Sequence, residues 1–243
     1  MALLAKTIAI TGAASGIGRM TTICLAGQGA NLSIADLDLD KLQEVAAEVK
    51  RQHPDCAVMC TALDVRHEHE VDEWIRQTVQ RFGFLDGAVN LAGVLRQGLV
   101  SDFALDDWRL VLDVNLTGVF VCTKAQIRSM NDGGSIVNAS SRAGLHGTAN
   151  YAAYCASKHG VIGLTKAVAQ EVGAKGIRAN CGSILARGVI DTPMTAAFEG
   201  VPADQIIQRK GRPDEIAFLI AYLLGDQSRF ITASTITIDG GLP

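Results

Sequence analysis

Residues 11–18 read Thr11-Gly12-Ala13-Ala14-Ser15-Gly16-Ile17-Gly18, and this stretch decides how the chain folds. It follows a short apolar run at 6–11 and opens an amphipathic stretch near 16–28, so we predict a glycine-rich turn between a strand and a helix. Glycines let the backbone turn sharply and approach a bound group closely. The N–H groups at the start of the helix would stabilise a pyrophosphate. The GxxxGxG spacing differs from the commonest GxGxxG fingerprint, so the turn is weak support on its own.

Outward from this turn, short β-branched or apolar runs alternate with longer amphipathic stretches along the whole chain. We predict strands at 6–11, 31–35, 57–62, 87–90, 135–139, 177–183 and 235–238. We predict helices near 16–28, 39–52, 67–82, 104–130, 150–174 and 213–224. Several strands are almost wholly apolar, which is typical of a parallel sheet covered by helices on both faces. The predicted fold class is α/β: a doubly wound, mostly parallel, seven-stranded sheet flanked by helices, Rossmann-like, in a single domain over 1–243.

The composition argues against several classes of function. Of the 243 residues, 48% are apolar and 19% are charged, and the net charge is −3. No block of like charges would attract nucleic acid or an acidic membrane. We expect no apolar run that approaches the length of a membrane span, no signal peptide, and a cytoplasmic protein. The six cysteines form no CxxC pair and the five histidines form no metal constellation, so we predict reduced thiols and no metal site.

Asp36 ends the second predicted strand, eighteen residues after Gly18. A carboxylate there can accept hydrogen bonds from both hydroxyls of an adenosine ribose, and it would repel the 2′-phosphate of NADP. No lysine or arginine stands at Ser15, Leu37 or Asp38 to neutralise such a phosphate. The alternative is a solvated turn residue ahead of a helix N-cap. Strand, glycine turn and acid together favour NAD as the cofactor, with NADP less favoured.

Tyr154 and Lys158 are four residues apart in the sequence YCASK, so a helix would place them on one face. A phenol is a poor base near neutral pH because its unperturbed pKa is about 10. We expect the ammonium group one turn away to favour the phenolate and lower that pKa. Tyr151 is a rival tyrosine, but it has no lysine four residues on. The alternative is a surface tyrosine and lysine, since YxxxK occurs often by chance.

These segments together resemble the short-chain dehydrogenase/reductase family, over essentially the full length of the chain. The matching motifs stand in the family's order: TGAASGIG at 11–18, Asp64-Val65, Asn90-Leu91-Ala92-Gly93, Asn115, Ser140-Ser141, YCASK at 154–158 and Asp239-Gly240-Gly241. The resemblance implies an NAD(P)-dependent oxidoreductase that acts on CH–OH or C=O groups. It further implies that Tyr154 gives or takes the hydroxyl proton while C4 of the nicotinamide exchanges hydride.

The resemblance also implies a role for each residue of the catalytic cluster. Ser141 would hold the substrate oxygen by a hydrogen bond, and Ser140 is the less suitable choice by its spacing from Tyr154. Lys158 would depress the pKa of Tyr154 and hydrogen-bond the nicotinamide ribose. Asn115 would anchor a water that links Lys158 to bulk solvent.

Cofactor contacts are implied along the whole chain. Asp64 and Val65 would contact the adenine, while the backbone at Ile190 and the hydroxyl of Thr192 would hold the nicotinamide carboxamide. The full set of implied contacts is Gly12, Ser15, Gly16, Ile17, Gly18, Asp36, Leu37, Asp64, Val65, Asn90, Ala92, Gly93, Tyr154, Lys158, Ile190 and Thr192.

The sequence departs from the family pattern in two places. Leu91 follows Asn90 where a second asparagine is usual. The stretch 180–188 is longer than the corresponding loop of the family, and Arg187 stands where a proline is usual. One interpretation is a harmless loop insertion, because closing a slightly longer loop costs little entropy. The other is that the insertion reshapes the pocket beside the nicotinamide and brings Arg187 near the substrate.

The stretch 191–212 fits the alternation least well, and we interpret it as a small substrate lid, with an ordinary connecting loop as the alternative. The leading hypothesis is an NAD(H)-dependent oxidoreductase that interconverts a small, fairly apolar secondary alcohol and its ketone. The alternatives are a non-redox isomerase, lyase or cyclase on the same fold, and a nucleotide-binding sensor without turnover. The resemblance implies a homotetramer or homodimer, with helices near 104–130 and 150–174 at one interface and the C-terminal strand at another.

Overall fold

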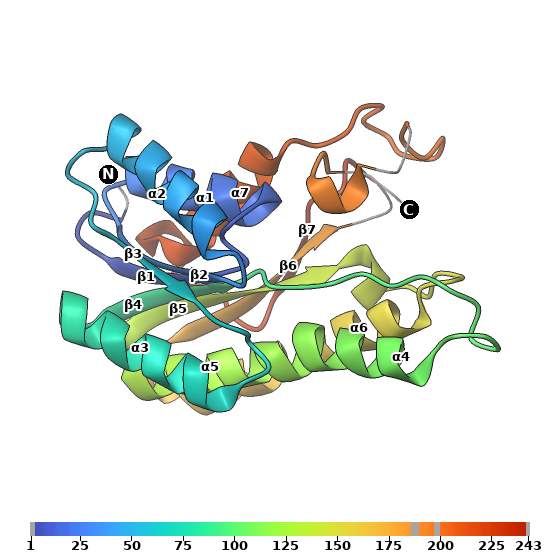
Figure 1. The fold of residues 1–243 in the computed structure, drawn as a ribbon, viewed down its shortest axis with the longest axis horizontal. Coiled ribbons are helices and arrows are strands. Elements are labelled where there is room, and N and C mark those ends of the chain that lie inside the picture. Colours follow the sequence, from blue (N-terminus) through green and yellow to red (C-terminus); the bar gives the residue numbers. More distant parts are fainter. Residues whose placement is uncertain (1–2, 186–189, 197–199, 242–243) are drawn as a thin grey trace.

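Seven parallel strands form one sheet in the computed structural model, which describes residues 3–185, 190–196 and 200–241. In order across the sheet, the strands are β3 (Val58–Ala62), β2 (Asn31–Asp36), β1 (Thr7–Thr11), β4 (Leu85–Asn90), β5 (Met130–Ser141), β6 (Arg178–Leu185) and β7 (Thr235–Thr237). The order runs outward in both directions from β1 and β4, so the sheet is doubly wound (Figure 1). The predicted fold class is confirmed.

Helices cover both faces of the sheet (Figure 1). One layer holds α1 (Gly16–Gly27), α2 (Leu39–Gln52) and α7 (Pro213–Leu224), and the other holds α3 (Glu68–Phe82), α5 (Gly118–Ser129) and α6 (Ala152–Val172). The short helix α4 (Leu105–Leu112) leads into α5 through a π-helical turn, η1 (Asp113–Thr117). The described residues also form four single-turn 3-10 helices: η2 (Arg142–Gly144), η3 (Gly173–Lys175), η4 (Pro193–Thr195) and η5 (Asp226–Ser228).

Strand β1 shows why the chain adopts this three-layer arrangement. All five of its residues are buried, because helices cover both faces of the sheet. Ile8 and Ile10 pack among the apolar side chains of one layer, and Ala9 packs among those of the other, as the alternation of side chains along a strand requires. Burying each isoleucine contributes about 1.5–3 kcal/mol. The glycine turn is therefore attached to the carboxyl end of a rigid central strand.

Most element boundaries lie within two residues of the prediction, and two differences are larger. The helix predicted at 104–130 contains the π-helical turn η1 between α4 and α5, and apolar periodicity does not reveal a local shift in the hydrogen-bond pattern. β5 begins at Met130 rather than at 135, because Met130 pairs with Leu85 ahead of a register shift. The exposed polar residues 131–133 hide this early start from the sequence pattern.

One helix of the described chain, Leu105–Ser129, is long and apolar enough to cross a membrane by length and composition alone. The expectation that no run approaches that length is therefore wrong. Half of the most apolar window of this helix is buried inside the domain, and α5 packs against α3 and the sheet. A core helix passes the same test, so packing accounts for its composition.

The stretch expected to be a lid is described at 191–196 and 200–212. Ile190, just before it, forms an isolated bridge with Gly211. The Ile207 N–H donates to the Gly240 carbonyl at 2.8 Å and the Ile206 N–H to the Gly241 carbonyl at 3.4 Å. These bonds hold the stretch against the C-terminal turn. Residues 197–199 lie outside the described residues, and its action as a lid stays a prediction.

Candidate active site

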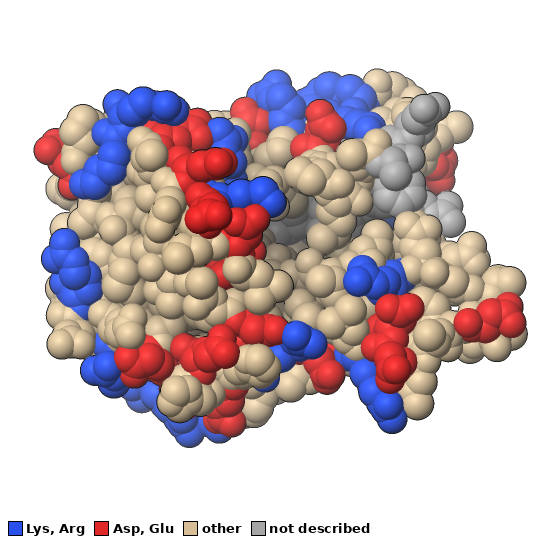
Figure 2. Space-filling model, in the orientation of Figure 1, with Lys and Arg blue, Asp and Glu red and all other residues tan. Residues whose placement is uncertain are grey.

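A cleft of about 290 Å³ opens beyond the carboxyl ends of β1 and β4, where the strand order reverses. In the space-filling view the surface is hollowed between the two layers of helices (Figure 2). The sequence-predicted residues that line the cleft are Gly12, Ser15, Gly16, Ile17, Gly18, Asp36, Leu37, Asp64, Val65, Ala92, Gly93, Tyr154, Lys158 and Thr192. Residues far apart in the sequence therefore meet in one cavity.

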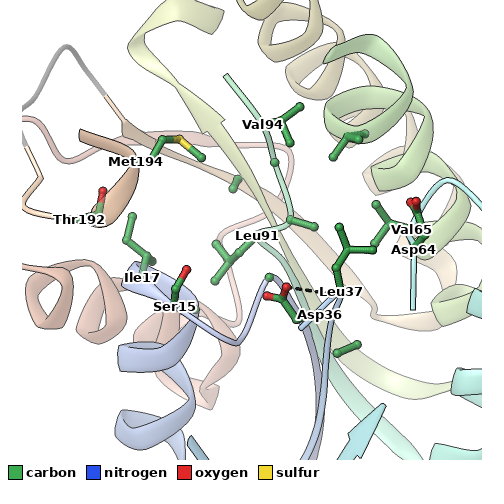
Figure 3. A pocket seen from close by; sticks show the side chains of 18 of the residues that line it. Ser15, Ile17, Asp36, Leu37, Asp64, Val65, Leu91, Val94, Thr192 and Met194 are labelled. Atoms are coloured by element: carbon green, nitrogen blue, oxygen red, sulfur yellow. Dashed lines mark hydrogen bonds between the residues drawn. The ribbon is translucent and has the colours of Figure 1, made fainter. Parts of the chain in front are cut away.

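The glycine turn, residues 12–18, leads from β1 into α1. Its backbone conformation disfavours a Cβ atom at the glycine positions described next. Gly12 and Gly16 have positive φ angles of 69° and 50°, and a Cβ atom on Gly18 would lie 1.9 Å from the Gly12 carbonyl oxygen. Ser15 is the N-cap of α1 but makes no side-chain cap hydrogen bond, which leaves the first N–H groups of the helix to another acceptor. Ser15 and Ile17 lie at the start of α1 on the cleft wall (Figure 3). This end of the helix fits an anionic group such as a pyrophosphate.

Asp36 lies at the end of β2 on the wall of the cleft (Figure 3). One carboxylate oxygen accepts a hydrogen bond from the Ala14 N–H at 3.0 Å, and the other accepts one from the Leu37 N–H at 2.8 Å. These two bonds fix the carboxylate beside the glycine turn. Each oxygen keeps further acceptor capacity, which fits a ribose that presents two hydroxyl groups.

Tyr154 on α6 and Ser141 at the end of β5 are joined by a side-chain hydrogen bond. Tyr154 is 5% exposed and Ser141 is 1% exposed. β5 lies three strands away from β2 in the sheet, a distance of about 14 Å at ordinary strand spacing. The phenol and Asp36 therefore occupy opposite ends of the cleft.

The pKa of Tyr154 moves in the direction opposite to the expected one. Burial raises the pKa of the phenol above its ordinary value, and the hydrogen bond with Ser141 offsets only part of that rise. The Lys158 ammonium lies 5.6 Å from the centre of the Tyr154 ring. The net shift is upward where a lowering was expected, because desolvation dominates. The effect of Lys158 on this pKa stays a prediction. The phenol is protonated at neutral pH.

Lys158 is buried on the same face of α6, and its Nζ donates to the Ala139 carbonyl at 2.8 Å. Burial lowers the pKa of Lys158 to about 8. The Ser140 hydroxyl donates to the Lys158 backbone carbonyl at 3.0 Å. Ser140 thus supports the helix, and it is Ser141 that the structure brings to the Tyr154 phenol.

Asn115 lies fully buried in the π-helical turn η1. Its amide oxygen accepts from the Val94 N–H at 2.8 Å, and its amide nitrogen donates to the Val94 carbonyl at 2.9 Å. The same nitrogen donates to the Ser157 hydroxyl at 3.4 Å. Val94 lines the cleft, so Asn115 fixes the loop after β4 from behind the cleft wall. Its role in a proton relay stays a prediction.

Two residues expected to contact the cofactor have side chains away from the cleft wall. The Asn90 amide donates to Gln126 at 3.0 Å and to Asn138 at 2.8 Å, inside a buried polar network. Ile190 is 2% exposed and packs in the core. Among the described residues, neither side chain lines the cleft, whereas that of Thr192 does.

The cleft also contains residues to which the sequence assigned no contact with cofactor or substrate. Arg66 lines it directly after Asp64 and Val65, and Leu91, Val94 and Met194 point into it (Figure 3). Adjacency to a predicted contact is the one signal that could have found Arg66 and Leu91. The remaining lining residues are Ala35, Leu63, Leu110, Val114, Ala139 and Pro193. Arg187 and its neighbours at 186–189 lie outside the described residues, so both interpretations of the longer loop stay predictions.

Comparisons with known proteins agree with this geometry. A family model described as enoyl-(acyl carrier protein) reductase matches residues 12–243. The short-chain dehydrogenase/reductase aba4 of Botryotinia fuckeliana is 44% identical, with 97% of this chain and 96% of that protein covered. A cyclohexanol dehydrogenase of an Acinetobacter species is 37% identical, with 97% and 94% covered.

Solved structures give the same result. The crystal structure of levodione reductase matches with a TM-score of 0.93 at 35% identity, covering 98% of each chain. A short chain dehydrogenase from Burkholderia cenocepacia in complex with NADP matches with a TM-score of 0.92 at 32% identity, covering 100% of this chain and 99% of that one. The chain belongs to the short-chain dehydrogenase/reductase family, whose enzymes are oxidoreductases that use NAD or NADP and act on small molecules.

Proposed function

We propose that this protein is an NAD(H)-dependent oxidoreductase that interconverts a secondary alcohol and a ketone, with Tyr154 as the general acid/base. One observation carries the proposal: the glycine turn and Asp36 line the same cleft as Tyr154 and Lys158. A cradle for a dinucleotide and a buried proton donor therefore share one cavity. The names of two similar proteins, a cyclohexanol dehydrogenase and a levodione reductase, support the same chemistry.

The residues of the cleft fit a pyridine dinucleotide. The start of α1, at 16–18, would hold the pyrophosphate, Asp36 the adenosine ribose, Lys158 the nicotinamide ribose and Thr192 the carboxamide. When bound, the nicotinamide supplies or accepts the hydride. The protein supplies orientation of the substrate and a path for its proton.

Tyr154 and Ser141, at the buried end of the cleft, would transfer the proton and bind the substrate oxygen. Negative charge develops on the carbonyl oxygen of a ketone as it is reduced. The Ser141 hydroxyl and the Tyr154 phenol can both donate to that oxygen, and Tyr154 gives up its proton to it. Because burial keeps the phenol protonated, a proton is available for donation at neutral pH. In the reverse direction Tyr154 takes the proton of the alcohol.

Lys158 and Asn115 would return the proton to Tyr154. The pKa of Lys158, about 8, lies close enough to neutral pH for proton exchange. We propose that the backbone of Asn115 anchors a water in this relay, because the amide oxygen and nitrogen of its side chain already bond to Val94.

The preference for NAD over NADP rests on Asp36. Its carboxylate is fixed on the cleft wall by two backbone N–H groups, and it would repel a 2′-phosphate at the same place. One similar structure holds NADP, so the preference is a property proposed for this chain and its Asp36.

We propose a small, fairly apolar substrate because apolar side chains surround the phenol. The partly buried residues packed around Tyr154, Val111 and Ala153 are Val94, Leu95, Phe103, Trp108, Ala143 and Tyr151. Such a wall binds an uncharged ketone better than a charged one. Activity toward an uncharged ketone would fit this wall.

We also propose a homotetramer or homodimer in the cytoplasm. Large apolar side chains are exposed on α5, at Phe120, and on α7 in the opposite layer, at Phe218 and Tyr222, and Phe230 after η5 is fully exposed. Exposed apolar area of this kind is typical of a protein interface. The six free cysteines suit a reducing compartment.

The test is a panel of uncharged ketones and alcohols with NAD(H) and NADP(H), followed by the absorbance of the reduced nicotinamide. We expect turnover with NADH that falls by about 10²–10⁴-fold in Tyr154→Phe, while this variant still binds NADH. Tyr151→Phe is the matched control, since it removes a second phenol from the same apolar cluster and should keep most of the kcat.

Two results would overturn the proposal. Product formation without a change in the redox state of the nucleotide would indicate the isomerase, lyase or cyclase. Nucleotide binding without any product over the whole panel would indicate the sensor.

A further inference from the structure

Arg66 lines the cleft and has no part in the chemistry proposed above. It lies at the adenosine end, because β3 is the neighbour of β2 and Asp36 pairs with Ala62. The Leu63 N–H donates to the Asp36 carbonyl at 3.0 Å, which brings the segment after β3 back toward Asp36. Arg66 therefore lies on the wall where the adenosine would lie.

The guanidinium of Arg66 is fixed along one edge by Asp64. Its Nε donates to the two carboxylate oxygens at 3.0 and 2.9 Å, and Nη2 donates to one of them at 2.6 Å. The Arg66 N–H donates to the same carboxylate at 3.0 Å. Arg66 therefore occupies the hydrogen-bond acceptor positions of the Asp64 carboxylate.

Asp64 is itself well fixed. Its N–H donates to the Glu70 carboxylate in the first turn of α3 at 2.9 Å, and its side chain is 14% exposed, compared with 40% for Arg66. The hydrogen bonds of Arg66 lower the pKa of Asp64, and those of Asp64 raise the pKa of Arg66, with Asp113 adding to the rise. The pair stays charged at neutral pH.

We propose that Arg66 is the residue of this segment that contacts the adenine, and that Asp64 acts through it as a positioning residue. A guanidinium held by one edge keeps its flat faces available, and such a plane stacks on an aromatic ring. The resemblance implies a direct contact between Asp64 and the adenine, so this assignment moves the contact by two residues. It rests on the dinucleotide part of the proposed function and not on the alcohol–ketone chemistry.

The test is equilibrium calorimetry without substrate, with three ligands: NADH, ADP-ribose, and reduced nicotinamide mononucleotide, which lacks the adenosine. Arg66→Ala should weaken the binding of NADH and ADP-ribose by about three- to thirty-fold. It should leave the binding of the mononucleotide unchanged, which also shows that the variant is folded. Arg66→Lys keeps the charge but loses the planar group, so it should lose most of the same affinity.

Arg76 on α3 supplies the matched control. Its Nε and Nη2 donate to Glu73 at 2.8 and 2.6 Å, much as Arg66 binds Asp64, and it does not line the cleft. Arg76→Ala should bind all three ligands like the wild type. Asp64→Asn should weaken ADP-ribose less than Arg66→Ala does, because it loosens the guanidinium without removing it.

The proposal is overturned if Arg66→Ala binds ADP-ribose with wild-type affinity, or if it weakens the mononucleotide in the same proportion. Wild-type affinity in Arg66→Lys would also overturn it, because charge alone would then account for the effect. A wild-type protein that binds ADP-ribose but reduces no ketone would refute the proposed function and leave the Arg66 test intact.

Discussion

The two ends of the cleft use charge in different ways. At the adenosine end, Asp64 and Arg66 are partly exposed, and their ion pair holds both groups in the charged form. At the reaction end, Tyr154 and Lys158 are buried, and desolvation shifts the pKa of each toward its neutral form. The partly exposed charged groups at the adenosine end bind and orient the ligand. The groups that transfer protons are buried, and burial stabilises their neutral forms.

Ser141→Ala should damage the reaction end while leaving Tyr154 and Lys158 in place. We expect kcat to fall by about 10²–10³-fold, because one of two donors to the developing oxygen charge is lost. The pKa of Tyr154 should rise further, since the hydrogen bond with Ser141 lowers it, so ionisation of the phenol should cause no loss of activity at alkaline pH. Steady-state kinetics from neutral to alkaline pH would measure both effects.

Ser140→Ala is its control, because that hydroxyl bonds to the Lys158 carbonyl and not to the phenol. Ser140→Ala should lower the free energy of unfolding and leave kcat nearly unchanged. An equal loss of kcat in the two variants, or a fall in activity at alkaline pH that Ser141→Ala shows and the wild type does not, would contradict the contrast between the two serines.

Lys158→Met measures what it costs to bury the ammonium. Burial lowers the pKa of Lys158 from 10.5 to about 8, a difference that corresponds to about 3 kcal/mol. Below about pH 8 the folded wild type buries a charged ammonium, which lowers its free energy of unfolding. The inactive variant should therefore be more stable by up to about 3 kcal/mol. The loss of the hydrogen bond to Ala139 reduces this gain. Between about pH 8 and 10.5 the unfolded chain binds more protons than the folded one, so wild-type stability rises with pH and the advantage of the variant disappears.

Chemical denaturation of both proteins at pH 7 and pH 10 would show this crossover. A variant that is less stable than the wild type at pH 7, or whose advantage grows with pH, would mean that the ammonium is well compensated in its buried place.

Asp36→Ser tests the exposed end, where we expect the smallest change. The carboxylate is partly exposed and its field is screened, so the preference for NAD over NADP should fall by about tenfold. The ratio of KM values for the two nucleotides measures it. Asp38→Ser is the control, because this carboxylate caps α2 through the Lys41 N–H and should leave the ratio alone. An unchanged ratio in Asp36→Ser would remove the basis for the NAD preference.

Most of the fold could be predicted because its signals are local. The apolar run of β1 and the glycines at 12–18 each encode their conformation within a few residues. The π-helical turn η1 and the early start of β5 escaped prediction, because they depend on hydrogen bonds and pairing, such as that of Met130 with Leu85, that no local pattern records.

The site could be predicted where sequence spacing alone places residues at the carboxyl ends of parallel strands. Its electrostatics could not. The raised pKa of Tyr154 follows from burial, and the position of Arg66 follows from its ion pair with Asp64. Asn90 was predicted to contact the cofactor, but hydrogen bonds to Gln126 and Asn138 hold its side chain in the core.

Asn90, Gln126, Asn138 and Thr165 would have to be changed together in any redesign of the core. Asn90 and Gln126 exchange hydrogen bonds, Asn90 donates to Asn138, and Asn138 donates to Thr165. Replacing one of these residues leaves its partners without a hydrogen bond, and an unpaired buried polar group lowers stability by about 1–3 kcal/mol. Libraries that vary these positions singly would therefore be dominated by poorly folded clones, whereas joint replacement by apolar side chains of equal volume leaves no orphaned donor or acceptor.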